Sequence, residues 1–130
     1  MPETIILAPG TVSRAALRRI YRERPAVALD PAWRVKVDDG AALVARAAGG
    51  AAPVYGVNTG FGALARQRIK PEDTETLQRN LILSHCCGVG PPTPPEVVHL
   101  MMALKIASLG RGACGVRLVV IDTLERMLAK

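Results

Sequence analysis

Residues 54–62, with the sequence VYGVNTGFG, combine a phenol with a flexible backbone and are the stretch best suited to chemistry. The phenol of Tyr55 can carry a proton, but free tyrosine has a pKa of about 10, so it acts as a base near neutrality only when positive charge or hydrogen bonds lower that pKa. Three glycines allow close approach of the backbone to a ligand: Gly56, Gly60 and Gly62. Their spacing matches no phosphate-binding fingerprint. The pattern fits a binding or catalytic loop, and equally a structural turn in which Tyr55 and Phe61 anchor the core.

A second candidate site is the pentapeptide SHCCG at residues 84–88, at the end of a predicted helix. His85 is either a charge-compensating group at the helix C-terminus or part of a functional site. A nucleophile and base pair made of Ser84 and His85 is disfavoured, because adjacent helical residues diverge by about 100° whereas such a pair must converge. Cys86 and Cys87 are interpreted as small buried hydrophobic residues.

The third candidate, SLGRGACGVR at residues 108–117, places two arginines among glycines. A guanidinium can bind a carboxylate through two parallel hydrogen bonds, so Arg111 and Arg117 could hold an anionic group. Alternatively, Arg111 satisfies backbone carbonyls where one helix ends before the next begins. The structural interpretation is favoured, because a break between helices leaves carbonyl groups without partners.

Caps, stops and apolar spacing predict a mainly α chain whose helices position these three stretches. A β-branched and apolar run at residues 4–8 predicts a short N-terminal edge strand or extended arm. Ser13 is the predicted N-cap of the first helix, and Asp30 followed by Pro31 opens the second. The predicted helices cover residues 14–24, 31–48, 71–87, 96–109 and 116–130.

The later helices carry three further expectations. Three apolar residues of the third helix are expected to face inward: Leu77, Leu81 and Ile82. Residues 97–106 are apolar on nearly every side, which indicates a helix that is central or covered by partners. In the last helix, Asp122 and Arg126 have the spacing of an ion pair.

The chain has 130 residues, 49% of them apolar, which is enough for one domain whose core needs no metal or disulfide. No run of about 18 uncharged apolar residues predicts a membrane span, and the first ten residues lack the basic and apolar regions of a signal peptide. We therefore expect a cytoplasmic protein without membrane contact. The last helix has no closing glycine, asparagine or proline near Lys130, which indicates a chain cut from a longer one.

Cysteine count and charge argue against several other classes. The three cysteines, two of them adjacent, fit neither a disulfide framework nor a zinc site, so reduced thiols and no metal are expected. The net charge of +6 comes from scattered basic residues with one cluster at 18–24. With one Trp, two Tyr and one Phe, the chain lacks the basic and aromatic footprint of nucleic-acid binding, and no nucleic-acid partner is expected.

Taken together, three strings resemble the N-terminal region of the aromatic amino-acid ammonia-lyases, in that family's order and approximate spacing. They are VYGVNTGFG at 54–62, LQRNLILSHCCGVG at 77–90 and MMALKIASLGRGACGVRLVVIDTL at 101–124. Asn58 and the pair Ser84 and His85 are similar to the histidine-specific branch of the family. The phenylalanine branch usually has threonine in place of Asn58 and lacks the histidine, whereas some tyrosine lyases keep it.

The resemblance implies elimination of ammonia from L-histidine to give trans-urocanate, part of histidine catabolism. It assigns to Tyr55 the role of the base that takes the β-proton, to His85 a contact with the substrate side chain, and to Asn58 a place in the loop or in the substrate site. A neutral imidazole at His85 suits an imidazole substrate, because each ring has one donor and one acceptor nitrogen. The family's electrophile is a methylideneimidazolone (MIO) formed from an internal Ala-Ser-Gly triplet, and its members are homo-oligomers.

Departures from the family pattern limit these expectations. No Ala-Ser-Gly triplet occurs in the 130 residues, so MIO is expected only in a longer parent protein. Residues 1–130 are therefore predicted to be a single N-terminal domain or fragment without the MIO-forming and C-terminal helical regions, inactive alone. Four residues depart from the types usual in relatives: Ala107 for asparagine, Cys114 for serine, and Cys86 and Cys87 for a small pair.

Two alternatives remain. One is another aromatic amino-acid lyase or aminomutase, with tyrosine as the substrate. The other is a non-catalytic helical interaction module derived from the family.

Overall fold

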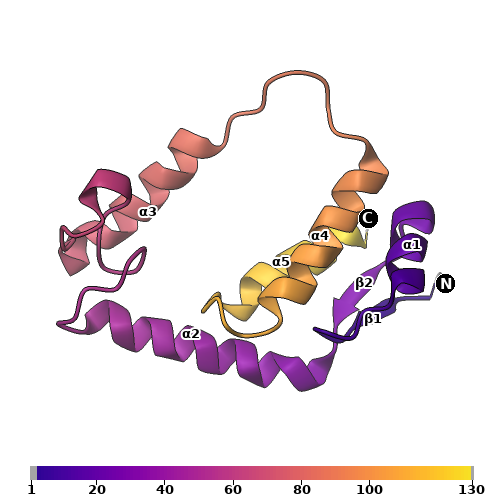
Figure 1. Cartoon of the computed structure of the whole chain (residues 1–130), viewed down its shortest axis with the longest axis horizontal. Helices are drawn as coiled ribbons and strands as arrows, with labels where there is room; N and C mark the ends of the chain where they lie inside the picture. Colours follow the sequence, from indigo (N-terminus) through magenta and orange to yellow (C-terminus); the bar gives the residue numbers. More distant parts are fainter. Residues whose placement is uncertain (1–2, 130) are drawn as a thin grey trace. The chain divides into compact units, whose positions relative to one another are not determined.

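A computed structural model describes residues 3–129 and is mainly helical, as the sequence predicts. It contains two compact units: unit 1 comprises the described residues up to Ala42 and from Pro92 onward, and unit 2 comprises Leu43–Pro91. Figure 1 shows the elements in chain order. They are β1 (Ile5–Leu7), α1 (Arg14–Glu23), β2 (Val27–Leu29), the 3-10 turn η1 (Pro31–Trp33), α2 (Arg34–Gly49), the 3-10 turn η2 (Gly62–Leu64), α3 (Pro71–His85), α4 (Pro95–Leu109) and α5 (Leu118–Leu128).

The two strands of unit 1 form a small parallel sheet. β1 pairs with β2 in the register that sets Ile5 opposite Val27, and α1 supplies the crossover that parallel pairing requires. The predicted strand at 4–8 is confirmed. β2 was not predicted, because three residues after a proline are too short a run to show the alternation of a strand.

Both predicted N-caps are confirmed by hydrogen bonds. The Ser13 hydroxyl accepts from the Ala16 backbone amide at 3.1 Å, and the Asp30 carboxylate accepts from the Ala32 amide at 2.9 Å. The segment that Asp30 caps is a 3-10 turn, and the α-helix proper begins three residues later than predicted, at Arg34.

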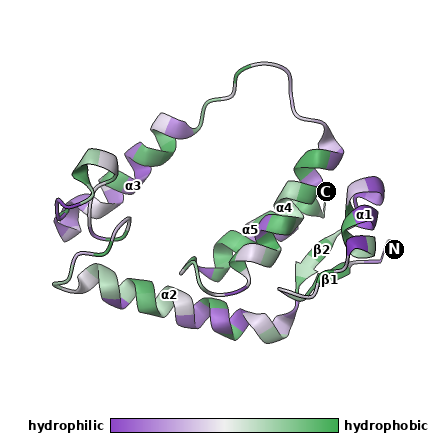
Figure 2. Ribbon diagram, in the orientation of Figure 1, coloured by the Kyte–Doolittle hydropathy of each residue, from purple (hydrophilic) through white to green (hydrophobic). Residues whose placement is uncertain are grey.

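The core of unit 1 lies between the sheet and helices α1, α4 and α5. α4 buries four side chains at helical spacing: His99, Ala103, Ile106 and Leu109. The buried imidazole of His99 bonds through Nε2 to the carbonyl oxygen of Pro25 at 2.8 Å, which ties α4 to the entry of β2. Figure 2 shows hydrophobic residues continuing along α4 and α5.

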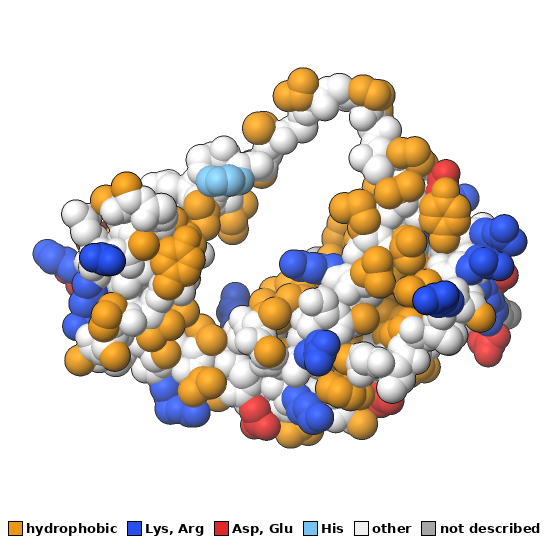
Figure 3. All heavy atoms as spheres, viewed as in Figure 1, with side chains coloured by type: hydrophobic (Ala, Val, Ile, Leu, Met, Phe, Trp, Pro, Cys, Tyr) orange, Lys and Arg blue, Asp and Glu red, His pale blue; other side chains and the backbone are white. Residues whose placement is uncertain are grey.

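The opposite face of α4 is not covered by the described residues of unit 1. Its exposed apolar side chains are Val98, Met101 and Leu104. Figure 3 shows hydrophobic side chains at the surface over this helix. The apolar character predicted for 97–106 is therefore present, and one side of the helix is buried while the other is accessible.

An ion-pair network joins the start of α2 to α5. The Arg34 guanidinium bonds to the carboxylates of Asp122 at 2.7 Å and Glu125 at 3.0 Å, and the hydrogen bond to Asp122 raises the pKa of Arg34. The predicted pair between Asp122 and Arg126 is wrong. Arg126 bonds instead to the backbone oxygen of Asp122 at 3.3 Å, because the half-buried Arg34 occupies the carboxylate.

Gly40, in the middle of α2, allows a close contact between backbones. A Cβ on Gly40 would overlap the carbonyl oxygen of Gly112, and a Cβ on Gly112 would overlap the carbonyl oxygen of Lys36. Gly112 also has a φ of 78°, in the left-handed region that favours glycine. Glycine at both positions is therefore required for α2 to pack against the segment that follows α4.

Helix α3 of unit 2 differs from its prediction in two ways. Ile82 is 65% exposed, whereas Leu77 and Leu81 are half-buried. The reason is angular: Ile82 lies about 100° around the helix from Leu81, so the two cannot share a narrow buried stripe. The helix also ends at His85 rather than before Gly88, where the Cys86 amide donates to the Ile82 carbonyl at 2.9 Å.

The interpretation of Cys86 and Cys87 as buried hydrophobic residues is wrong, since both residues are exposed. Cys114 is exposed as well. Cys86 and Cys87 follow the last residue of α3, so they lie outside the helix face that packs.

Among residues 3–129, no helix combines the length and apolarity needed to cross a membrane.

Candidate functional site

The loop that carries Tyr55 begins with a tight turn. The amides of Val57 and Asn58 both donate to the carbonyl oxygen of Val54, at 3.0 and 3.2 Å. Gly56 has a φ of 73° inside this turn, which a side chain would disfavour. Tyr55 therefore lies at an outward position of a constrained turn.

The ring of Tyr55 is 65% exposed and contacts the ring of Phe61 edge to face, with centroids 5.9 Å apart and planes at 74°. This geometry is a favoured arrangement for two aromatic rings. The alternative in which Tyr55 anchors a core does not hold, because most of its side chain is accessible. No hydrogen bond to the phenolic oxygen occurs within residues 3–129.

Asn58 lies in the interior of the same loop, 3% exposed. Its Oδ1 accepts from the Val54 amide at 2.7 Å, and its Nδ2 donates to the carbonyl oxygens of Ala47 and Ala52 at 3.2 and 3.0 Å. A carboxamide has two N–H donors, and both are used here. Asn58 thus connects the end of α2 to the turn that carries Tyr55.

The other two loop glycines occupy different settings. Gly60 is buried, and a Cβ there would press against Leu64. Gly62 has a φ of 57° at the start of η2. The expectation that these residues belong to a binding loop remains a prediction.

Arg68 is a residue of this loop system that sequence reasoning missed. Its guanidinium donates to the carbonyl oxygens of Gly50 at 2.7 Å and Ala51 at 3.2 Å, just after α2 ends. Its backbone faces Thr59 in an isolated antiparallel bridge, flanked by hydrogen bonds from Gly60 to Gln67 and from Ile69 to Asn58, each 3.0 Å. The partners of its guanidinium are 17 and 18 residues away, so no local pattern could reveal them.

His85 is exposed at the last position of α3. Its Nδ1 lies 2.8 Å from the carbonyl oxygen of Leu81 and 3.0 Å from the Ser84 hydroxyl. A carbonyl oxygen can only accept, so Nδ1 carries the hydrogen and, in the neutral ring, Nε2 carries the lone pair. The exposed edge of the imidazole therefore presents an acceptor. The Ser84 hydroxyl contacts the same Nδ1 atom. Because that atom carries the hydrogen, it cannot act as a base that activates Ser84 as a nucleophile.

The third candidate stretch belongs to unit 1. Arg111 is exposed beside a surface pocket that includes Leu104, Ala107 and Ser108, and Arg117 is the N-cap residue of α5. In the described part of the chain, the Arg111 guanidinium makes no hydrogen bond to a carbonyl, contrary to the structural role predicted for it.

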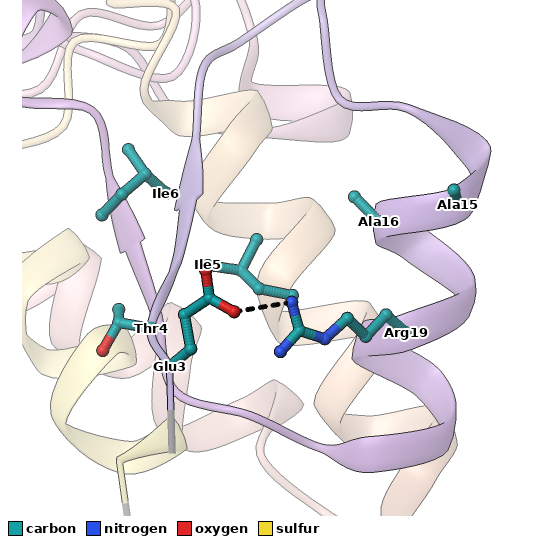
Figure 4. Close-up of a pocket in the computed structure, with 7 residues that line it drawn as sticks. All are labelled: Glu3, Thr4, Ile5, Ile6, Ala15, Ala16 and Arg19. Carbon is teal, nitrogen blue, oxygen red and sulfur yellow. Dashed lines mark hydrogen bonds and ion pairs between the residues drawn. The ribbon is translucent and has the colours of Figure 1, made fainter. Parts of the chain in front are cut away.

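Figure 4 shows another pocket of unit 1, between β1 and α1, with a volume of about 430 Å3. Arg19 lies at its edge and pairs with Glu3 at 3.1 Å and Glu23 at 2.8 Å, and these carboxylates raise its pKa. None of the predicted site residues lines this pocket. Within the described range, no group of three or more His, Cys, Asp or Glu side chains is placed to hold a metal ion.

Residues 12–130 match the family model for aromatic amino acid lyases, and the chain belongs to this family. It is 59% identical over 126 residues to a histidine ammonia-lyase from Bradyrhizobium diazoefficiens, a match that covers 97% of this chain and 24% of that protein. The chain thus spans about a quarter of the length of this relative.

Solved structures give the same result for the fold. A tyrosine aminomutase from Streptomyces globisporus superposes with a TM-score of 0.89 at 26% identity, covering 98% of this chain and 24% of that one. The ergothioneine-degrading enzyme ergothionase from Treponema denticola superposes with a TM-score of 0.89 at 24% identity, covering 98% and 26%. The fold is that of the N-terminal part of the ammonia-lyases.

Proposed function

We propose that this chain is part of a histidine ammonia-lyase-like enzyme that eliminates ammonia from L-histidine to give trans-urocanate. The observation that carries the proposal is the exposed phenol of Tyr55 on a constrained turn, in a chain 59% identical to a histidine ammonia-lyase. The enzyme would be cytoplasmic and homo-oligomeric, with a free amino acid as its substrate.

Tyr55 is the proposed base for the β-proton of the substrate. Its oxygen is accessible, and the edge-to-face contact with Phe61 supports one orientation of the ring. To act as a base near neutrality, the phenol needs positive charge or hydrogen-bond donors at its oxygen. Within residues 3–129 no hydrogen bond meets that oxygen, so we assign those groups to other parts of the enzyme.

His85 is the proposed contact with the imidazole of the substrate. Because Nδ1 donates to the Leu81 carbonyl, Nε2 is available as an acceptor for an N–H group of the substrate ring. A substrate ring without an N–H group at this position would leave Nε2 unpaired, so a contact of this kind contributes to selectivity.

The family's MIO group supplies an electrophile that makes the amino group of the substrate a better leaving group. Its precursor triplet, Ala-Ser-Gly, is not in these 130 residues, so the residues of this chain cannot form it. We therefore propose that residues 1–130 by themselves do not catalyse the elimination.

A second candidate is a tyrosine aminomutase, which would move the amino group without net release of ammonia. The superposition on tyrosine aminomutase favours it, and the hydroxyl of tyrosine could also donate to Nε2 of His85. The higher identity to histidine ammonia-lyase favours histidine.

The test uses a full-length enzyme that contains this sequence, incubated separately with L-histidine and L-tyrosine. We expect urocanate and an equal amount of ammonia from histidine. Formation of β-tyrosine without ammonia, and no urocanate, would replace the proposal with the aminomutase. No turnover of either amino acid would favour the non-catalytic interaction module.

A further inference from the structure

We propose that Arg68 is a positioning residue for Tyr55, acting with Asn58 as a clamp that fixes the turn at residues 54–58 to the end of α2. The inference rests on the proposed role of Tyr55 as the base. It assigns to Arg68 a function that the sequence motif around Tyr55 does not include.

Asn58 forms the inner part of the clamp. Its three hydrogen bonds reach Ala47 in the last turn of α2, Ala52 after it and Val54 at the start of the Tyr55 turn. With both N–H groups committed and 3% of the residue exposed, Asn58 has no donor to offer a substrate. Its contribution to the site is therefore the placement of the turn.

Arg68 forms the outer part of the clamp. A helix leaves its last carbonyl groups without intrahelical partners and carries partial negative charge at that end. The guanidinium lies just beyond this end and uses two separate N–H donors, one to the carbonyl oxygen of Gly50 and one to that of Ala51, the first two residues after the helix. A single ammonium group is a point charge and does not present the same planar fork, so lysine is an incomplete substitute.

The backbone of Arg68 is itself attached to the loop on the far side of Tyr55. The bridge between Thr59 and Arg68, with the flanking bonds of Gly60 and Ile69, joins residues 58–60 to residues 67–69. The backbone of Arg68 thus holds the segment after the Tyr55 turn, and its side chain holds the segment before the turn. Arg68 therefore connects the two segments.

Tyr55 needs this support because packing does little to hold it. Its side chain is largely exposed, and the interaction that the structure shows for its ring is the edge contact with Phe61. The position of the phenolic oxygen therefore follows the backbone of the turn. Proton transfer requires heavy atoms within hydrogen-bond distance, and a misplacement of about 1 Å can cost on the order of 100-fold in rate.

The experiment compares Arg68→Ala with Arg66→Ala in the full-length enzyme. Arg66 is a matched control, since it is exposed in the same segment and makes no hydrogen bond or ion pair within the described residues. We expect Arg68→Ala to lower kcat by about 10-fold to 100-fold with a smaller change in KM, and to speed hydrogen exchange at residues 50–58. Arg68→Lys should recover part of kcat, and Arg66→Ala should leave both constants unchanged.

A double-variant comparison separates the clamp from the proposed role of Tyr55. If Arg68 acts through Tyr55, Arg68→Ala should lower kcat in the parent enzyme and have little further effect in a Tyr55→Phe background. An equal loss in both backgrounds, or unchanged kcat and hydrogen exchange in Arg68→Ala, would overturn the clamp. Normal kcat in Tyr55→Phe alone would instead overturn the proposed function.

Discussion

His85 is the residue whose chemistry the structure specifies most directly, because the Leu81 carbonyl fixes the hydrogen on Nδ1. We predict that His85→Leu in the full-length enzyme raises KM for histidine about 5-fold or more, since it removes a recognition hydrogen bond worth roughly 1 kcal/mol or more. Steady-state kinetics with histidine and tyrosine measure the effect. Ser84→Ala is the control: it leaves the bond to Leu81 intact, and an equal rise in KM there would argue against a contact through Nε2.

At this scale, sequence reasoning could identify the types of the candidate residues but not their partners. Tyr55 stands out because a phenol among glycines is unusual, and His85 because it ends a predicted helix. The contacts of Asn58 and Arg68 involve backbone amide and carbonyl groups 4 to 18 residues away, which only the folded backbone brings together. The exposure of Tyr55 could not be predicted either, because an aromatic residue in a turn occurs both in cores and at surfaces.

Among the elements, α2 gives the clearest prediction. In an isolated helix Gly40→Ala would be stabilising by about 1 kcal/mol, but here the new Cβ would overlap the backbone of Gly112. We expect net destabilisation of about 1–3 kcal/mol, as for other overpacked contacts, seen as a lower Tm by circular dichroism.

Gly49→Ala is the matched control in the same helix. No atom lies within 4 Å of a Cβ built at Gly49, so this change should be neutral or stabilising. Equal Tm values for the two variants would contradict the close packing of α2 on the segment around Gly112.

The elements show which sequence signals are reliable. Local signals such as N-caps and prolines located the helices, because they act within a few residues. Signals that depend on tertiary contacts failed: Asp122 pairs with Arg34, 88 residues away, rather than with Arg126 four residues along the helix. β2 was missed for the same reason, since a three-residue strand is defined by its partner β1.

At the scale of the whole molecule, the accessible apolar face of α4 predicts self-association. Val98, Met101 and Leu104 lie on this face, and contiguous exposed apolar patches of several hundred Å2 are uncommon in monomers. Light scattering of the 130-residue chain at high concentration should give a mass of a dimer or larger. Met101→Lys should shift the distribution toward monomer, and a monomeric parent chain would contradict the prediction.

The absence of the Ala-Ser-Gly triplet predicts the activity of the isolated chain. Purified residues 1–130 should show no MIO absorbance and release no urocanate from histidine, because the β-proton is too weakly acidic for a tyrosine without an electrophile. Urocanate formed by a preparation of verified mass would refute this expectation and the mechanism behind it.

The central claim is that the phenolic oxygen of Tyr55 is the base, and Tyr55→Phe in the full-length enzyme tests it most directly. The substitution keeps the ring and its edge contact with Phe61, so the melting temperature should change little. The account predicts that kcat for histidine falls by about 100-fold to 10,000-fold while KM changes far less, as for the loss of a positioned proton carrier. Turnover close to that of the parent enzyme would contradict the account.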